Sequence, residues 1–381
     1  MSNSIHAITM PRWGMTMTEG QLVKWLVQVG EPVTVGQEIL EIETEKIANV
    51  LEATAAGTLR RQVVTEQSVA MVGNLLGVIS DGQPGEEAID AFVAAFADRQ
   101  QSSEDTESSG PAARSVEIEG GSINVLSMGD GAAVPAVFIH GFGGDLNSWL
   151  FNHPEIAESR PAHALDLPAH GASSIPRTAM MVENLADAVL STLDRLGLER
   201  CHIVAHSLGA AMALLIARDL PSRVASLSLV SPVGLGPEIN NQYIRDFLGA
   251  ERRAQMSKAL STLFADPSQV RREMADDVLR FMRTDGVPAA LRALAEDAFP
   301  DGRQRLTLRE VIGTGKVPVQ IIWGEADRII PSGHAAGLES SAKVHVLPGV
   351  GHMAYLEQAG RVNELLTQFM ATIDAAQSKE K

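Results

Sequence analysis

The chain contains almost no cysteine and fewer basic than acidic residues. Its 381 residues include a single cysteine, Cys201, which excludes an internal disulfide framework and a metal cluster held by cysteines alone. The 31 Lys and Arg residues against 47 Asp and Glu residues leave a net charge of −16. Because a phosphate backbone repels a chain this acidic, we do not expect nucleic acid as a partner.

Long apolar runs are also missing. No run reaches the ~18 residues that a transmembrane helix requires, so we expect no contact with a membrane. Residues 1–11 lack the basic patch followed by an apolar stretch that marks a secretory signal. We therefore expect a cytoplasmic protein.

Hydrophobic residues make up 45% of the chain, which is enough to form a sizeable core. Residues 101–113 read QSSEDTESSGPAA, a polar, Ser-rich composition that is typical of flexible linkers. We predict a first domain over 1–80, a flexible linker over 81–113 and a second domain over 114–376. As a random coil the linker would span roughly 30 Å. Four apolar residues with helical spacing predict a short helix inside it: Ile89, Phe92, Val93 and Phe96.

The first 80 residues contain an internal repeat. Similar residues recur 37 positions apart, as with Gly20 and Gly57. Two similar halves of short strands and glycine turns predict a small β-sandwich. Between the halves, residues 38–53 (EILEIETEKIANVLEA) begin with alternating apolar and acidic side chains. Residues 44–46 (TEK) interrupt this alternation, and the apolar character then resumes. This pattern predicts a hairpin with Lys46 near its tip.

After residue 114, strand-like apolar runs alternate with helical periodicity. Such alternation predicts an α/β fold with a mostly parallel sheet covered on both faces. The segment 235–310 breaks the pattern with helix-like spacing, so we expect a helical lid over the ends of the strands. The strand-like runs cover residues 134–141, 163–168, 201–207, 224–232, 317–327 and 343–349.

Ser207 is the first candidate catalytic residue. It stands between a strand-like run and a helical pattern, with the small residues Ala205 and Gly209 on either side, as in a nucleophile elbow. A helix N-cap serine is the competing interpretation. Asp327 and His352 follow two later strands, and the order Ser, Asp, His is that of α/β-hydrolases. In a triad, His352 would take the serine proton and Asp327 would hold the imidazole.

The loop His140–Gly144 (HGFGG) follows a predicted strand. In the α/β-hydrolase fold this loop and the residue after the nucleophile supply backbone N–H groups to an oxyanion. We therefore assign these two roles to Phe142 and Leu208.

Other reactive residue types have structural explanations. We expect His140 to structure its loop and His170 to bond a neighbouring turn, and we do not expect His206 to act as the general base. Cys201 begins a predicted buried strand and should lie in the core. We expect no metal site, because no HExxH motif occurs and the histidines lack the spacing of metal ligands.

The first domain resembles the lipoyl domains of 2-oxo acid dehydrogenase complexes over residues 5–80. The sequence that carries the resemblance is MPRWGMTMTEGQLVKWLVQVGEPVTVGQEILEIETEKI. It implies an all-β barrel-sandwich hybrid with lipoic acid in amide linkage to Lys46. Biotin carriers are the nearest alternative, but their lysine lies between two methionines, whereas Lys46 lies between Glu45 and Ile47.

The second domain resembles the α/β-hydrolase superfamily over about residues 115–375, and the whole chain resembles the acyltransferase components of acetoin dehydrogenase complexes. This resemblance implies acyl transfer from S-acetyldihydrolipoyl-Lys46 to coenzyme A. It also implies three partners: a thiamine-diphosphate-dependent acetoin dehydrogenase component, dihydrolipoamide dehydrogenase, and a lipoate ligase or transferase. We further expect an oligomer.

The residues themselves leave the acyl acceptor open. Coenzyme A could attack an acyl-Ser207, or its thiol could attack directly with His352 as base. Water could attack instead, which would make the protein a serine hydrolase or thioesterase. A carrier and scaffold with an idle hydrolase domain is the third alternative.

Overall fold

The computed structural model describes residues 5–11, 19–43, 48–53, 55–82, 84–104 and 112–377. The chain divides into two compact units, Met1–Gly110 and Pro111–Lys381. Each unit has its own hydrophobic core.

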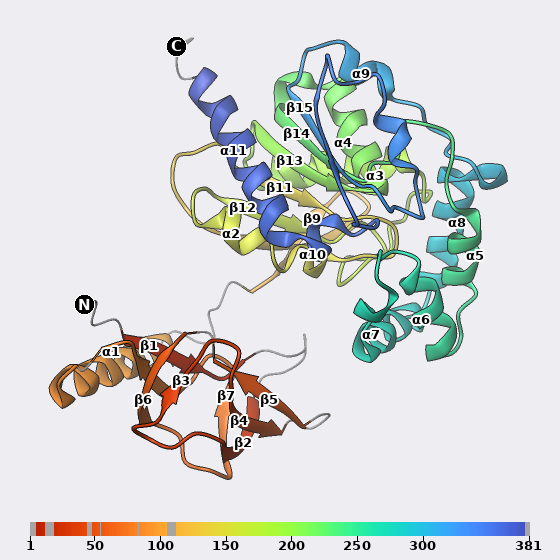
Figure 1. Cartoon of the computed structure of the whole chain (residues 1–381). Coiled ribbons are helices and arrows are strands. Elements are labelled where there is room, and N and C mark those ends of the chain that lie inside the picture. The colour runs from red at the N-terminus through yellow and green to blue at the C-terminus, as the bar shows by residue number, and fades with distance from the viewer. Residues whose placement is uncertain are drawn as a thin grey trace. The chain divides into compact units, whose positions relative to one another are not determined.

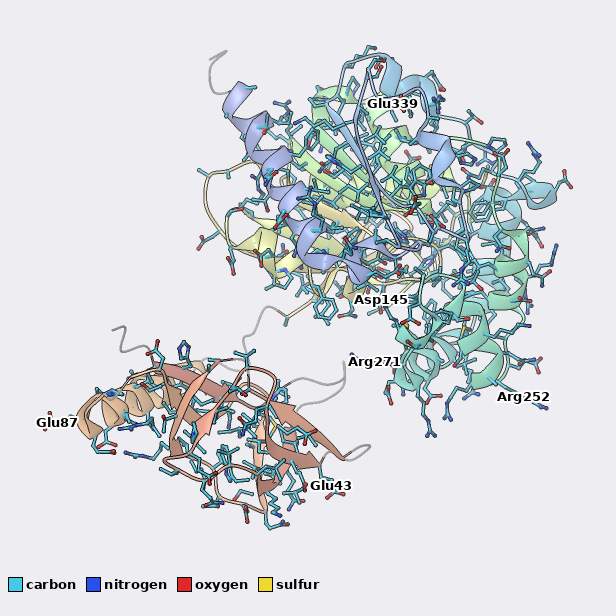
Figure 2. All side chains as sticks on the ribbon, in the orientation of Figure 1. Glu43, Glu87, Asp145, Arg252, Arg271 and Glu339 are labelled. Atoms are coloured by element: carbon cyan, nitrogen blue, oxygen red, sulfur yellow. The ribbon has the colours of Figure 1, made fainter. Side chains whose placement is uncertain are left out.

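The first unit is built from two four-stranded antiparallel sheets (Figure 1). Leu22, Leu40 and Ile42 are fully buried in its core. The neighbours of Ile42 are Glu41 and Glu43, and the Glu43 side chain is exposed at the end of its strand (Figure 2). The predicted small all-β domain is therefore confirmed. One sheet consists of β1 (Ile5–Thr9), β8 (Leu75–Ser80), β6 (Gly57–Gln62) and β3 (Pro32–Val33), and the other of β5 (Ala48–Glu52), β4 (Glu38–Glu43), β2 (Glu19–Trp25) and β7 (Ser68–Met71).

Strands β4 and β5 form the hairpin that the alternating pattern predicts. They pair antiparallel, with Glu43 opposite Ala48. Lys46 belongs to residues 44–47 between the two strands, which lie outside the described residues.

Helix α1 (Glu86–Glu104) occupies most of the segment that we expected to be a flexible linker. Ile89 on this helix is fully buried. The Arg61 guanidinium of β6 lies 2.9 Å from the Glu86 carboxylate and 2.8 Å from the Asp90 carboxylate. The random-coil estimate for 81–113 therefore does not apply to the helix, which is held against the first unit. The predicted domain limits themselves stay predictions.

The second unit contains an eight-stranded sheet in the order β16-β15-β14-β13-β11-β12-β10-β9. Neighbouring strands from β11 to β16 run parallel, and β9 and β10 pair antiparallel at one edge. The six strand-like runs of the sequence correspond to β11–β16. The first three strands are β9 (Arg114–Ile118), β10 (Gly121–Met128) and β11 (Ala136–Ile139), followed by β12 (Ala162–Leu165), β13 (Cys201–His206), β14 (Val224–Val230), β15 (Val319–Gly324) and β16 (Lys343–Leu347).

The β9–β10 hairpin was missed in the sequence, because its residues are mostly half-exposed and do not form a continuous apolar run. Parallel central strands are buried on both faces, whereas edge strands are not.

Helices cover both faces of this sheet, as predicted. Alternate residues of β11 point to opposite faces, so Val137 belongs to one core cluster and Phe138 to the other. The helices of the first cluster are α3 (Val182–Arg195) and α4 (Leu208–Asp219), and those of the second are α2 (His153–Ala157), α10 (Ala354–Glu357) and α11 (Ala359–Gln377).

The connection from β14 to β15 is helical and forms the lid. Figure 1 shows its four main helices grouped at one side of the second unit. These helices, with the short helix that follows them, are α5 (Asn241–Leu248), α6 (Arg253–Ser261), α7 (Arg272–Met282), α8 (Val287–Ala298) and α9 (Arg309–Gly313).

Candidate active site

Ser207 lies at a sharp turn between β13 and α4. Its φ of 50° and ψ of −117° are rare for a residue with a side chain. Ser207 is the N-cap residue of α4 by position, but its side chain makes no capping hydrogen bond to the helix. A Cβ at position 209 would lie 2.5 Å from the carbonyl oxygen of His140. Glycine is therefore needed there, because helix and strand approach closely at this turn.

Ser207, His352 and Asp327 are brought together by three separate loops. The Ser207 Oγ lies 3.0 Å from Nε2 of His352, and Nδ1 of His352 lies 2.8 Å from Oδ2 of Asp327. The exposed fraction is 7% for Ser207 and 2% for His352. The geometry is that of a nucleophile, a base and an orienting acid.

Asp327 is held by four donors. Besides His352, the indole N–H of Trp323 donates to Oδ2 at 2.9 Å. The backbone N–H groups of Ile329 and Ile330 donate to Oδ1 at 2.8 and 3.0 Å. Burial alone would raise the pKa of Asp327, but the charge and hydrogen bond of His352 and the two backbone N–H groups outweigh burial and lower it. The carboxylate is thus stabilised in its ionised form.

The two expected oxyanion donors lie beside Ser207. Leu208 is the first residue of α4, a position whose N–H has no partner within the helix. Phe142 follows Gly141, where a Cβ would lie 3.0 Å from the Cβ of Ser207. Within the described ranges, no hydrogen bond from the Phe142 N–H to a backbone carbonyl occurs.

Two buried histidines hold the loop on either side of Phe142. Nδ1 of His140 donates to the Gly141 carbonyl at 2.8 Å, and its Nε2 accepts from the Leu167 N–H at 2.9 Å. The Gly143 N–H donates to Nε2 of His170 at 3.2 Å. Burial lowers the pKa of His140 to about 4 and that of His170 to about 3. Both rings are therefore neutral, and their expected structural roles are confirmed.

The lid contacts this loop through aromatic rings. The Phe142 ring lies 5.7 Å from that of Phe247 on α5 and 6.4 Å from that of Phe299, just after α8. The sequence offered no signal for these contacts, because each partner belongs to an insertion without a recognisable motif.

The surroundings of His206 and Cys201 fit structural roles. Nε2 of His206 lies 3.2 Å from the carbonyl oxygen of His352. Burial, followed by the charge of His352, lowers the pKa of His206 well below its usual value. Cys201 is fully buried, and burial raises the pKa of its thiol to about 12. The expectation that Cys201 lies in the core is confirmed.

Over the described part of the chain, no group of three or more His, Cys, Asp or Glu side chains could hold a metal ion. No described helix is both long and apolar enough to cross a bilayer.

Comparisons with known proteins agree with this architecture. A family model described as "alpha/beta hydrolase fold" matches residues 135–359, and one described as "Biotin-requiring enzyme", a biotin/lipoyl model, matches residues 6–79. Among solved structures, a meta-cleavage product hydrolase from Pseudomonas fluorescens IP01 is similar, with a TM-score of 0.62 and 24% sequence identity. The match covers 68% of this chain and 97% of that one, and it shows the fold alone.

Two relatives match nearly the whole chain. The dihydrolipoyllysine-residue acetyltransferase component of the acetoin cleaving system of Pseudomonas putida is 42% identical over 97% of this chain and 99% of the relative. The corresponding component of Cupriavidus necator is 40% identical over 97% and 98%. The two-unit fold and this full-length similarity show that the chain belongs to the family of dihydrolipoyllysine-residue acetyltransferase components of acetoin cleaving systems.

Proposed function

We propose that the protein transfers an acetyl group from a dihydrolipoyl arm on Lys46 to coenzyme A, and that Ser207, His352 and Asp327 carry the transfer. The observation that supports this most directly is the hydrogen-bonded series from Ser207 Oγ to Asp327, in a chain whose first unit is of the lipoyl type. A thioester is an acyl donor that such a series can use.

We assign lipoic acid to Lys46 of the first unit, which is of the biotin/lipoyl type. Strands β4 and β5 pair up to Glu43 and Ala48, and Lys46 lies between these two residues in the sequence. When attached there, the lipoyl group supplies a thiol that carries an acyl group as a thioester. Lys46 would hold it in amide linkage.

Acylation begins at Ser207. His352 Nε2 takes the Oγ proton while Oγ forms a bond to the thioester carbonyl carbon. The N–H groups of Phe142 and Leu208 donate to the oxyanion that develops. When the tetrahedral centre collapses, the carbon–sulfur bond breaks, and His352 gives its proton to the sulfur that leaves. Asp327 stabilises the imidazolium between these two steps.

Deacylation repeats these steps in the reverse order, with the thiol of coenzyme A in place of the lipoyl thiol. His352 takes the proton of the coenzyme A thiol, whose sulfur attacks the acyl carbon. The bond to Ser207 Oγ then breaks, and Oγ recovers the proton from His352. Direct attack by the thiol on the donor thioester would need the same base but no acyl-serine.

As a component of an acetoin-cleaving system, the protein would work with other enzymes. A thiamine-diphosphate-dependent acetoin dehydrogenase component would load the acyl group, and dihydrolipoamide dehydrogenase would reoxidise the arm. A lipoate ligase or transferase would attach the lipoyl group to Lys46. We place the protein in the cytoplasm, as an oligomer.

The test uses lipoylated, reductively acetylated full-length protein and its Ser207→Ala variant. We expect acetyl-coenzyme A to form in the wild type only when coenzyme A is present, and to fall at least 10³-fold in the variant. A mass increase of one acetyl group on Ser207 before coenzyme A is added would support the acyl-serine route. If that mass is missing while transfer depends on His352, direct thiol attack is the better mechanism.

Two results would contradict the proposal. Rapid acetate release without coenzyme A would identify a hydrolase with a tethered substrate. Turnover of the complex that is unchanged both in Ser207→Ala and in His352→Ala would identify an idle hydrolase domain that serves as a carrier and scaffold.

A further inference from the structure

A short piece of the lid lies directly against the loops that carry the triad. This lid segment, residues 261–265, begins with the last residue of α6. The backbone N–H of His352 donates to the carbonyl oxygen of Leu263 at 2.8 Å. The position of the catalytic imidazole therefore depends on a bond to the lid.

Gly351, just before His352, shows how closely the two backbones approach. A Cβ at this position would lie 2.6 Å from the backbone nitrogen of Ala265 and 2.7 Å from the carbonyl oxygen of Leu263. Both neighbours are backbone atoms, which cannot rotate away as a side chain can. A residue without a side chain is required here by packing against the lid.

Glu357 joins the lid segment to the same loop. One carboxylate oxygen accepts the Gly351 N–H at 3.0 Å, and the other accepts the Ala265 N–H at 2.9 Å. A single side chain, at the end of α10, thus receives one backbone bond from the loop of His352 and one from the lid. Bonds of this kind to an ionised acceptor are the stronger class of hydrogen bond.

Arg328 binds the lid segment from the loop that carries Asp327. It follows Asp327 directly in the chain. Its guanidinium donates to the carbonyl oxygen of Ser261 at 2.9 Å and also to that of Phe264. The lid segment is therefore bound both by the loop that carries Asp327 and by the loop that carries His352.

We propose that Glu357 and Arg328 are positioning residues, which keep His352 aligned with Ser207 by fixing the lid segment between the two triad loops. The inference rests on the proposed role of Ser207 and His352. It implies that residues 261–265 stay in place during the reaction while other parts of the lid admit the acyl donor. Since a misplacement of about 1 Å costs on the order of 10²-fold in rate, loosening either contact should lower the rate of chemistry.

The decisive variants are Glu357→Gln and Arg328→Gln in the full-length protein. A glutamine at 357 keeps one acceptor oxygen and turns an amide NH₂ toward a second backbone donor, so one of the two bonds is lost. Glu364→Gln is the matched control, because Glu364 is an exposed residue of α11 whose only described partner is Arg361 at 2.8 Å.

Four readouts separate positioning from folding and from the overall reaction. The first is the rate at which a fluorophosphonate modifies Ser207, which needs the triad but neither a lipoyl arm nor coenzyme A. The second is the kcat and KM of acetyl transfer from free S-acetyldihydrolipoamide to coenzyme A. Amide hydrogen exchange at Gly351 and His352 reports the local backbone, and a thermal melt reports global folding.

We expect a 10- to 100-fold loss of Ser207 modification and of kcat in Glu357→Gln, with KM within about twofold. Arg328→Gln should show the same pattern, and Glu364→Gln should match the wild type. Exchange at Gly351 and His352 should rise in both positioning variants while the melting temperature stays within a few degrees. Wild-type rates in both variants, or losses that follow the unfolded fraction alone, would overturn the inference. If Ser207 reacts with the phosphonate but no acetyl transfer occurs, the proposed function fails while the positioning inference is still tested.

Discussion

Replacing Asp327 by asparagine tests the triad most sharply, because the structure predicts a large rate loss with a small stability loss. Among the described residues, four groups donate to the carboxylate, from His352, Trp323, Ile329 and Ile330. An asparagine offers one acceptor oxygen and an NH₂ group. If the oxygen keeps the two backbone N–H groups, the NH₂ group faces the imidazole of His352.

The imidazole can satisfy that NH₂ group only by changing tautomer. Nδ1 then becomes an acceptor and Nε2 carries the proton, so His352 can no longer take a proton from Ser207. In serine proteases the equivalent change lowers kcat about 10⁴-fold, which corresponds to about 5 kcal/mol of transition-state stabilisation. The Trp323 N–H loses its carboxylate but still lies 3.2 Å from the Ile330 carbonyl oxygen. We therefore expect only about 1 kcal/mol of lost stability.

The pH dependence of stability tests the ionisation of Asp327 independently of the reaction rate. The pKa of Asp327 is lowered in the folded state, so its ionised form stabilises the fold above the unfolded-state value of about 3.9. That contribution is lost as the pH falls through the lower, folded-state pKa. The gap in unfolding free energy between the wild type and Asp327→Asn should therefore narrow below pH about 4.

The assay combines acetyl transfer to coenzyme A with urea unfolding of the same preparations. Glu325→Gln is the matched control, because Glu325 is an exposed carboxylate two residues earlier in the same loop. A variant at position 327 that retains more than a tenth of wild-type kcat would refute the tautomer argument. A loss of activity that matches the loss of folded protein would refute it as well.

Three further predictions concern packing and charge. Gly209→Ala should lower the free energy of unfolding by ~1–3 kcal/mol, because the added Cβ would meet the His140 carbonyl oxygen at 2.5 Å; unchanged urea unfolding would contradict this. Arg61→Ala should accelerate amide exchange in the first two turns of α1, because Arg61 pairs there with two carboxylates, and equal exchange would show that apolar contacts alone hold the helix. Since the pKa of His170 falls to about 3 on folding, the unfolded state binds the extra proton, and unfolding free energy should decrease as the pH is lowered below about 6.5. The slope should be smaller in His170→Asn, and equal slopes would refute the assignment.

Local patterns in the sequence were sufficient to predict much of the fold and the candidate catalytic residues. The alternation in residues 38–53 predicted the β4–β5 hairpin, since side chains of a strand point alternately to its two faces. The continuous apolar runs predicted the central parallel strands, because those strands are buried on both sides. The small residues around Ser207 and the chain order of Ser207, Asp327 and His352 indicated the triad.

Other features depend on contacts between residues that are distant in the chain. Helix α1 was expected within a flexible linker, but its attachment to the first unit depends on Arg61, which lies 25 positions before Glu86. The hydrogen bond from Ala265 to Glu357 spans 92 positions, and no local pattern distinguishes this glutamate from an exposed one. Sequence periodicity reports only which face of an element is buried. The packing of the lid against the triad loops decided which backbone groups remain unpaired at that face and which side chain reaches them.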